Sequence, residues 1–174
     1  MKSSVDAIKE LRDLTCSSVG HCKKALEDAK GDIKQAVILL RKQGLEIAAK
    51  KQGRAAKEGR VECYIHHGSK IGVLLEVNCE SDFVARNEEF VKFTKDLAMH
   101  IAATSPEYIK KEDVPEDVLK HEKSKEDYYK NNCLLEQVFV KDPSLTIKDY
   151  LGNIVAKIGE NVVIRRFIRY KIGE

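Results

Sequence analysis

The residues best placed to act on another molecule lie in one short segment, residues 78–87. In it, Phe83 follows the carboxylate of Asp82, soon after an apolar run at residues 73–77 that is typical of a buried strand. A helical pattern begins immediately downstream. Because aromatic side chains are normally buried, Phe83 at such a junction either packs under its own helix or is held out for a partner. In the second case the chemistry is recognition, with an aromatic wedge and its neighbouring carboxylate entering another protein.

Two other groups contain residue types that can do chemistry. Cys63, His66 and His67 are the nearest candidates for zinc, but they lack the ligand spacing of zinc sites, and a strand ending in a turn explains them better. Cys79 beside Glu80 could be a thiol with a base, but adjacent residues in an extended segment point in opposite directions. We find no nucleophile–base constellation, Gly-rich phosphate loop or pair of catalytic carboxylates. The sequence therefore predicts no enzyme activity, no cofactor and no metal.

Composition limits the class of protein that carries this segment. A chain of 174 residues suits one medium domain or two small ones, and its 43% hydrophobic content is enough for a core. No stretch approaches the roughly 18 apolar residues of a membrane span, and the N-terminus has no apolar signal region. The 5 cysteines, an odd number without paired spacing, fit reduced thiols. We therefore expect a cytoplasmic protein, an organelle matrix being the alternative, with no membrane contact.

Charge is distributed unevenly along the chain. The net charge is +3, but residues 1–60 contain 14 Lys/Arg and 8 Asp/Glu, a balance of +6, so that the remainder carries −3. A basic N-terminal segment followed by a mildly acidic remainder indicates an anionic partner surface near the N-terminus. Charge alone leaves open whether that surface is protein or nucleic acid.

The elements that must position these residues begin with three short helices in the first 45 residues. Ser17 or Ser18 can cap the second helix and Asp32 the third. Gly31 and Gly44 are predicted to end the second and third helices, because glycine readily takes the left-handed conformation of a helix end. Apolar residues at helical spacing predict the inward faces: Val5, Ile8, Leu11, Val19, Cys22, Ala25, Leu26, Ala29, Ile33, Ala36, Val37 and Leu40.

A small sheet is predicted after the helices. Residues 61–66 and 71–77 indicate a hairpin of two strands, and residues 162–170 indicate a last strand. Further helices are predicted over residues 88–103, 115–131 and 146–158, with a turn at Pro143. Three strands with flanking helices make an α+β fold in which antiparallel pairing is expected. The chain then divides into a helical module (1–45), a basic connector helix (46–60) and an α+β core (61–174).

Three blocks of residues carry a resemblance to a known family. The first block comprises residues 11–15, 22–26, 31–32 and 40–44, the second is residues 78–87, and the third comprises residues 134–137, 139–143, 159–161 and 165–167. In this order they resemble the family of translation elongation factor Ts, the guanine-nucleotide exchange factor for elongation factor Tu. The resemblance covers nearly the whole chain, and it implies that the first three helices form a UBA-like bundle.

The resemblance implies roles for four residues of the second block. Ser81, Asp82, Phe83 and Val84 stand where the family has its Thr-Asp-Phe-Val signature, with the hydroxyl kept at Ser81. It implies that Phe83 is a wedge in the nucleotide domain of elongation factor Tu, with Asp82 as its polar partner. Ser81 and Val84 then hold the turn. Insertion displaces Mg²⁺ and its phosphate contacts, so that GDP leaves; the expected partner forms are GDP-bound and nucleotide-free.

The N-terminal block supplies a second set of candidate contacts. By the same resemblance, Arg12, Cys22, Lys23 and Lys24 face the partner's acidic surface, although an ordinary solvated helix face explains each lysine equally well. The unpaired sheet edges also allow a homodimer. The chain departs from the family in length, because the region between about residues 119 and 133 is shorter than in the family's compact forms.

Two other classes of function remain open from the sequence. A UBA-like adaptor would bind ubiquitin-like or other peptides through the three helices, but it leaves residues 81–87 without a role. RNA binding through the basic connector is disfavoured, because the chain has no Trp, only 6% aromatic residues and no stacking motif. The sequence therefore predicts an exchange factor without direct nucleic-acid contact.

Overall fold

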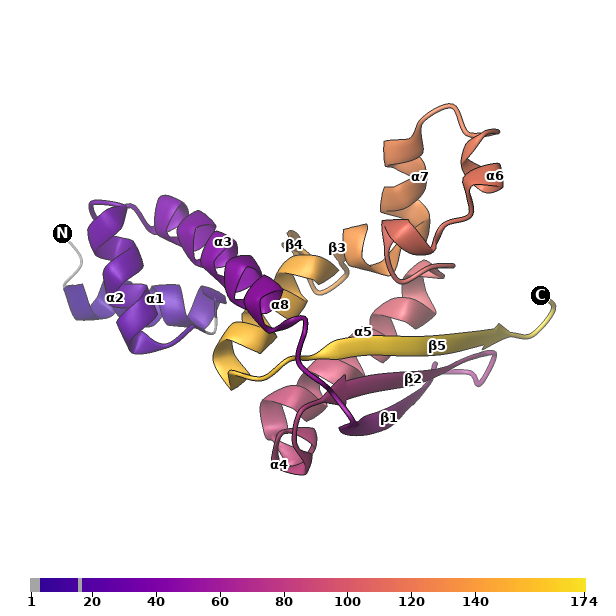
Figure 1. The fold of residues 1–174 in the computed structure, drawn as a ribbon, viewed down its shortest axis with the longest axis horizontal. Helices are drawn as coiled ribbons and strands as arrows, with labels where there is room; N and C mark the ends of the chain where they lie inside the picture. The colour runs from indigo at the N-terminus through magenta and orange to yellow at the C-terminus, as the bar shows by residue number, and fades with distance from the viewer. Residues whose placement is uncertain (1–3, 16) are drawn as a thin grey trace.

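The computed structural model of the protein describes residues 4–15 and 17–174. Helices α1 (Ser4–Thr15), α2 (Val19–Asp28) and α3 (Ile33–Lys51) lie together at one end of the molecule (Figure 1). They enclose a core of their own, formed by Leu11, Cys22, Ala25, Leu26, Ala36 and Leu40. The predicted N-terminal three-helix module is therefore present.

Local capping begins and ends these helices largely as predicted. The Ser18 hydroxyl accepts a hydrogen bond from the His21 N–H at 3.3 Å, and the Asp32 carboxylate accepts from the Lys34 N–H at 2.8 Å. Two predicted inward residues are instead exposed, Val5 by 70% and Val19 by 54%. Periodicity identifies the apolar face of a helix, but the neighbouring helices decide how far along that face burial extends.

Gly44 does not end the third helix, contrary to the prediction, because α3 continues to Lys51. The residue is buried where α3 crosses α8 (Ile147–Ile158) at Gly152. A β-carbon on Gly44 would lie 3.4 Å from the Gly152 carbonyl oxygen, and one on Gly152 would lie 3.3 Å from the Gly44 carbonyl carbon. Both glycines thus permit close contact between two backbones.

The helix α3 therefore joins the module to the rest of the protein. Its first half lies in the module's core through Ala36 and Leu40, and its second half packs on the larger core through Ile47 and Ala48. The predicted boundary between a module ending at residue 45 and a connector at 46–60 lies inside this helix. The connector is helical only as far as Lys51.

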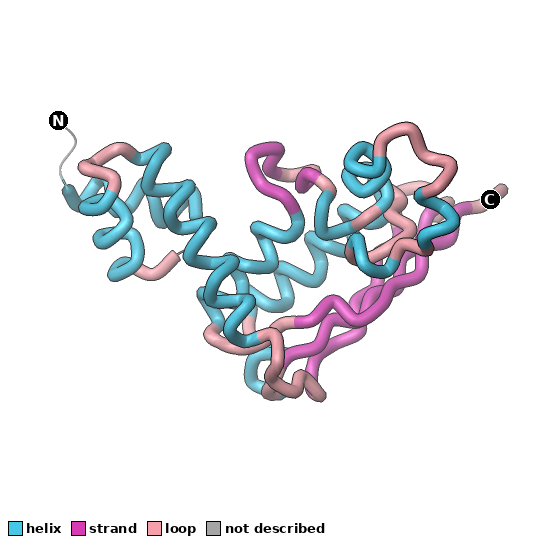
Figure 2. The backbone as a smooth tube through the Cα atoms, turned by 45° about the horizontal axis from the view of Figure 1, so that its top comes forward, coloured by secondary structure: helices cyan, strands magenta, loops and turns pink. Residues whose placement is uncertain are grey.

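The sheet has the predicted antiparallel arrangement. Strands β1 (Glu58–Ile65), β2 (Ile71–Cys79) and β5 (Val163–Lys171) pair in the order β1-β2-β5. Helices cover one side of this sheet, as Figure 2 shows. The covering helices are α5 (Glu88–Thr104) and α8, and the side chains buried between the layers include Val73, Leu75, Val77, Phe90, Phe93, Leu97, Ile101, Ile154 and Val155. The α+β class is thus confirmed.

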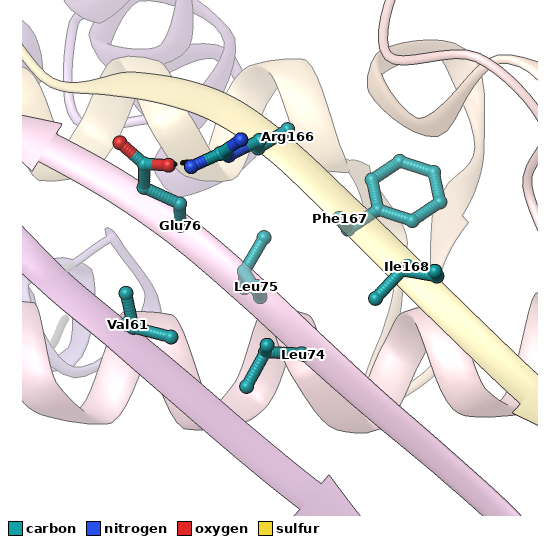
Figure 3. Close-up of a pocket in the computed structure, with 7 residues that line it drawn as sticks. All are labelled: Val61, Leu74, Leu75, Glu76, Arg166, Phe167 and Ile168. Carbon is teal, nitrogen blue, oxygen red and sulfur yellow. Dashed lines mark hydrogen bonds and ion pairs between the residues drawn. The ribbon is translucent and has the colours of Figure 1, made fainter.

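The other side of the sheet is open. Val61, Leu74 and Ile168 are 61%, 50% and 44% exposed on it, because strand residues alternate between the two faces. They border a shallow depression of about 480 Å³, beside which the Arg166 guanidinium lies 2.7 Å from the Glu76 carboxylate (Figure 3).

The remaining elements are short: α4 (Asp82–Arg86), η1 (Lys111–Asp113), α6 (Glu116–Leu119), α7 (Lys125–Asn132), η2 (Leu134–Glu136), β3 (Val138–Phe139) and β4 (Asp142–Thr146). The prediction of one helix over residues 115–131 is wrong, because α6 and α7 are separate and project together from the body (Figure 1). Neither contains a buried residue, so no packing face joins them into one helix.

A second, two-stranded sheet, β3-β4, was not predicted. Pro143 lies in β4 rather than in the predicted turn, at an edge where the missing N–H of proline is tolerated. The four cysteines within the described residues are unpaired, and Cys16 lies outside them. In the same part of the chain, no helix combines the length and the apolar character needed to cross a bilayer.

Candidate functional site

Phe83 stands on the single-turn helix α4, between β2 and α5. Its side chain is 80% exposed, whereas Val84 packs against the core and Ala85 is buried. The helix begins at Ser81, whose hydroxyl accepts a hydrogen bond from the Val84 N–H at 3.4 Å. Phe83 thus does not pack under its own helix, which was the first of the two alternatives, and its ring faces solvent.

The carboxylate beside the ring is paired locally. Asp82 forms an ion pair with Arg86 one turn later, and the Arg86 Nε–H donates to the Asp82 carbonyl at 3.3 Å. Both side chains are more than half exposed. An exposed pair of this kind contributes little to stability, so Asp82 can exchange its partner for a group on another protein.

The start of α4 is fastened to the turn that follows α8. One oxygen of the Glu160 carboxylate accepts hydrogen bonds from the backbone N–H groups of Glu80 and Ser81, both at 3.0 Å. The other accepts from the Ser81 hydroxyl at 2.6 Å. Ser81 is therefore both the cap of α4 and a donor to a residue of another element.

The cysteine next to this turn is not a nucleophile. Burial, with a smaller contribution from the Glu160 charge, raises the pKa of Cys79 to about 11, so its thiol stays protonated at neutral pH. That thiol donates to the Ser81 carbonyl at 3.1 Å. The Glu80 carboxylate accepts instead from the Asn161 N–H at 2.6 Å. The structure therefore gives Cys79 and Glu80 no thiol–base pairing.

The candidate contacts of the N-terminal module divide into exposed and buried residues. Arg12, Lys23 and Lys24 are exposed, and Lys23 Nζ lies 4.0 Å from Glu27. Cys22 is completely buried, and burial raises the pKa of its thiol. Cys22 therefore supports the module from inside and offers no contact surface in this structure.

Sequence reasoning missed four exposed apolar side chains on the module. Val5, Leu14, Val19 and Ile38 are 70%, 55%, 54% and 54% exposed. Ile38 falls between the buried positions Ala36 and Leu40, so its departure from the apolar stripe was the one available signal. Leu14 and Val19 have the spacing of core residues, and only the packing of the helices reveals their exposure.

The Phe83 turn and the module lie apart in the molecule, with α4 beside one end of the sheet and with α1 and α2 at the far end of α3 (Figure 1). A partner that reaches both must be a macromolecule. Among the described residues, no group of three or more His, Cys, Asp or Glu side chains could hold a metal ion. An exposed aromatic side chain on a fastened turn, together with a separate helical module, is typical of the class of proteins that act by binding other proteins.

The comparison with known families agrees with this class and identifies the family. The family described as elongation factor TS matches residues 2–127 and 125–174. The chain belongs to the elongation factor Ts family, the nucleotide exchange factors for elongation factor Tu in translation elongation. Such a protein is an exchange factor rather than a catalytic enzyme.

Relatives named elongation factor Ts match nearly the full chain. The protein of Caldanaerobacter subterraneus subsp. tengcongensis is 50% identical over 194 aligned positions, covering 98% of this chain and 97% of its own length. That of Geobacter sulfurreducens is 47% identical over 197 positions, covering 100% of this chain and 91% of the relative. That of Fervidobacterium nodosum is 45% identical over 197 positions, with 100% of both chains covered.

The alignments also show a difference in length. A 197-position alignment that includes all 174 residues of this chain leaves 23 positions without a residue here. The two family matches meet at residues 125–127, at the start of α7 and inside the segment that the sequence predicts to be shortened. The chain is thus a short form of the family.

Proposed function

We propose that this protein releases GDP from elongation factor Tu by inserting Phe83 into the nucleotide domain, with Asp82 as the polar group beside it and with loss of Mg²⁺ and its phosphate contacts. The observation that carries this proposal is the 80% exposure of Phe83 on a turn whose other residues are held in place. Ser81 caps the turn and Val84 anchors it. We also propose a cytoplasmic location, because the relatives are bacterial.

The binding free energy that Phe83 can contribute is too small for this function. A 10⁴-fold change in nucleotide affinity needs about 5.5 kcal/mol of differential binding, whereas burying one phenylalanine contributes about 1.5–3 kcal/mol. The exposed cations Arg12, Lys23 and Lys24 are the proposed source of further contacts, with an acidic surface of elongation factor Tu opposite them. Because coupling is reciprocal, this protein binds the nucleotide-free form more tightly than the GDP-bound form.

The test is stopped-flow release of a fluorescent GDP analogue from elongation factor Tu, followed with this protein and with its Phe83→Ala variant. Fast release by the wild type and slow release by the variant are expected. Equal acceleration by both would overturn the role of Phe83. No acceleration by either would overturn exchange by this chain and would favour the adaptor function.

We further propose that the open face of the sheet binds a second copy of the chain. Its exposed apolar residues include Val61, Leu74, Ile168 and Tyr170, and both outer strands, β1 and β5, have an unpaired edge within the described sheet. Pairing two such faces would remove the apolar surface of both copies from water. Light scattering at micromolar concentration should give the mass of a dimer. A monomer mass alone would contradict this proposal.

A further inference from the structure

We propose that Glu160 is a positioning residue for exchange, which fixes the direction of Phe83 through Ser81. This inference rests on the proposed function of Phe83 and assigns a role to the turn after α8. Glu160 lies 77 residues from Phe83 in sequence, yet its carboxylate receives both backbone N–H groups at the start of the Phe83 turn.

Because α4 is short, its orientation depends on the hydrogen bonds between Glu160 and the start of the helix. A helix of five residues has too few internal hydrogen bonds to fix its own orientation. Its first turn leaves N–H donors unsatisfied unless a cap or another acceptor takes them. The Ser81 hydroxyl caps the helix, and the Glu160 carboxylate accepts a hydrogen bond from that hydroxyl at 2.6 Å, so the capping oxygen is itself held in place. Charged acceptors make the stronger hydrogen bonds.

The contact is reciprocal, which makes the two turns one rigid unit. The Glu80 carboxylate accepts from the Asn161 N–H at 2.6 Å, while the Glu160 carboxylate accepts from the Glu80 N–H at 3.0 Å. Gly159 precedes this pair with a φ of +81°, a conformation that turns the chain after α8 toward the Phe83 turn.

The same unit is tied to the end of α3. The Asn161 side-chain amide donates to the Arg54 carbonyl at 2.8 Å, and the Arg54 guanidinium lies 3.5 Å from the Glu80 carboxylate. Lys51, the last residue of α3, donates to the Gly159 carbonyl. The Phe83 turn is therefore held relative to the helix that carries the N-terminal module, and a partner that binds the module meets Phe83 in a fixed position.

The test compares Glu160→Gln with the wild type in the release of a fluorescent GDP analogue from elongation factor Tu. Glutamine keeps the size of the side chain but removes the charge and one acceptor oxygen. We expect a maximal release rate about tenfold lower, the effect of losing about one charge-assisted hydrogen bond. The half-saturating concentration should change less than about threefold, because the module is intact. Glu122→Gln, on the exposed segment between α6 and α7, is the matched control and should behave as the wild type.

Two further variants separate positioning from general stability. Ser81→Ala removes the hydroxyl that joins the cap of α4 to the Glu160 carboxylate, and it should match Glu160→Gln. The double variant Phe83→Ala with Glu160→Gln should be no slower than Phe83→Ala alone, because both changes remove the same contact. Losses that multiply in the double variant would overturn the proposal, as would a Glu160→Gln protein with the wild-type rate.

Hydrogen exchange supplies a readout that does not depend on activity. In Glu160→Gln the amides of Ser81 and Val84 should exchange faster, while those of α5 keep their protection. Unchanged exchange at both amides would overturn the positioning role even if release slows. If the wild type itself releases no nucleotide, the proposed function fails, whereas a rapid wild type with an equally rapid Glu160→Gln variant contradicts only this inference.

Discussion

The Phe83 turn and the N-terminal module present apolar side chains to solvent in different ways. Phe83 is 80% exposed on a single-turn helix whose capping residue, Ser81, donates hydrogen bonds to Glu160 in a distant turn. The module exposes Val5 by 70% and Leu14, Val19 and Ile38 each by little more than half, on helices that have a core of their own. One surface is a single projecting group, and the other is spread over three helices.

For the proposed function, this difference predicts that the two regions affect different quantities, one the maximal rate of exchange and the other the affinity for the partner. A projecting ring on a preorganised turn loses little conformational entropy when it enters a partner, and it suits a step that requires one position. Partly exposed apolar groups with cations nearby suit general affinity, in which each contributes a small share. The Phe83 turn should therefore govern the maximal rate of release, and the module should govern the concentration needed to reach it.

The largest effect is expected from Phe83→Ala. It should lower the maximal rate by about 10- to 100-fold, since burial of a phenylalanine contributes about 1.5–3 kcal/mol. The free energy of unfolding should change by less than about 0.5 kcal/mol, because the ring is exposed. Stopped-flow release at saturating protein and a urea titration measure the two quantities. A large loss of stability would make Phe83 a folding residue and remove the contrast with the module.

The second-largest effect is expected at the contact between α3 and α8, which joins the two regions. Gly152→Ala places a β-carbon 3.3 Å from the backbone of α3, so we expect a loss of about 1 kcal/mol in the free energy of unfolding. Gly20→Ala in α2 meets no atom within 4 Å and should gain up to about 1 kcal/mol from helix propensity. Urea unfolding of the two variants should give opposite signs. Equal gains would show that α3 and α8 adjust freely.

Acid should weaken the sheet domain through His100 on α5. Its ring is completely buried, Nε2 lies 3.0 Å from the Gln137 side-chain oxygen and Nδ1 accepts from the Val140 N–H at 3.4 Å. Burial lowers its pKa, so the unfolded chain binds a proton first. The stability is fully present above the unfolded pKa of about 6.5 and falls below it by up to about 1.4 kcal/mol per pH unit until the folded pKa is reached.

The measurement is the free energy of unfolding at pH 7.5 and at pH 5.5. His100→Gln should reduce the difference between the two values, whereas His67→Gln, at an exposed position, should preserve it. An unchanged difference in His100→Gln would assign the acid sensitivity to other groups.

A smaller effect on affinity is expected from the apolar surface of the module. Val19→Ser should raise the half-saturating concentration roughly fivefold, a loss of about 1 kcal/mol of apolar contact. The maximal rate should remain that of the wild type. A lower maximal rate with unchanged affinity would contradict the division between the two regions.

The smallest effect is expected from Lys24→Ala. Exposed ion pairs contribute about 0.2–1 kcal/mol, so the half-saturating concentration should rise by less than about fivefold and the rise should disappear in high salt. Lys123→Ala, in the exposed segment between α6 and α7, is the control and should leave the value unchanged. An effect of Lys24→Ala that persists at 0.5 M salt or so would indicate a buried contact rather than surface attraction.

Several features follow from local sequence, because neighbouring residues determine them. Of the two candidates Ser17 and Ser18, Ser18 is the cap of α2, and Asp32 caps α3 as predicted. Asn87 likewise caps α5 by accepting from the Glu89 N–H at 2.9 Å. Alternating apolar residues marked the hairpin of β1 and β2, although β1 begins at Glu58 rather than at residue 61. Gly31 has the expected positive φ of +84°, but α2 ends at Asp28 and Lys30, with a φ of +51°, takes the first left-handed position after the cap.

The predictions from sequence were wrong where contacts between distant residues determine the structure. Gly44 has the local character of a helix end, but its contact with Gly152 makes it an interior residue of α3. The short strands β3 and β4 have too few residues for a visible alternation. Residues 115–131 have helical composition but no apolar face, so they form two short helices instead of one.

By itself, the sequence determined the α+β class, the order of the main elements, the family and the segment that contains Phe83, because these depend on composition, periodicity and residue order. Only the tertiary structure decided that Phe83 faces solvent and that Cys22 does not. It alone also joined Ser81 to Glu160, 79 residues away. Burial and such hydrogen bonds depend on which distant segments become neighbours, and local spacing carries no information about that.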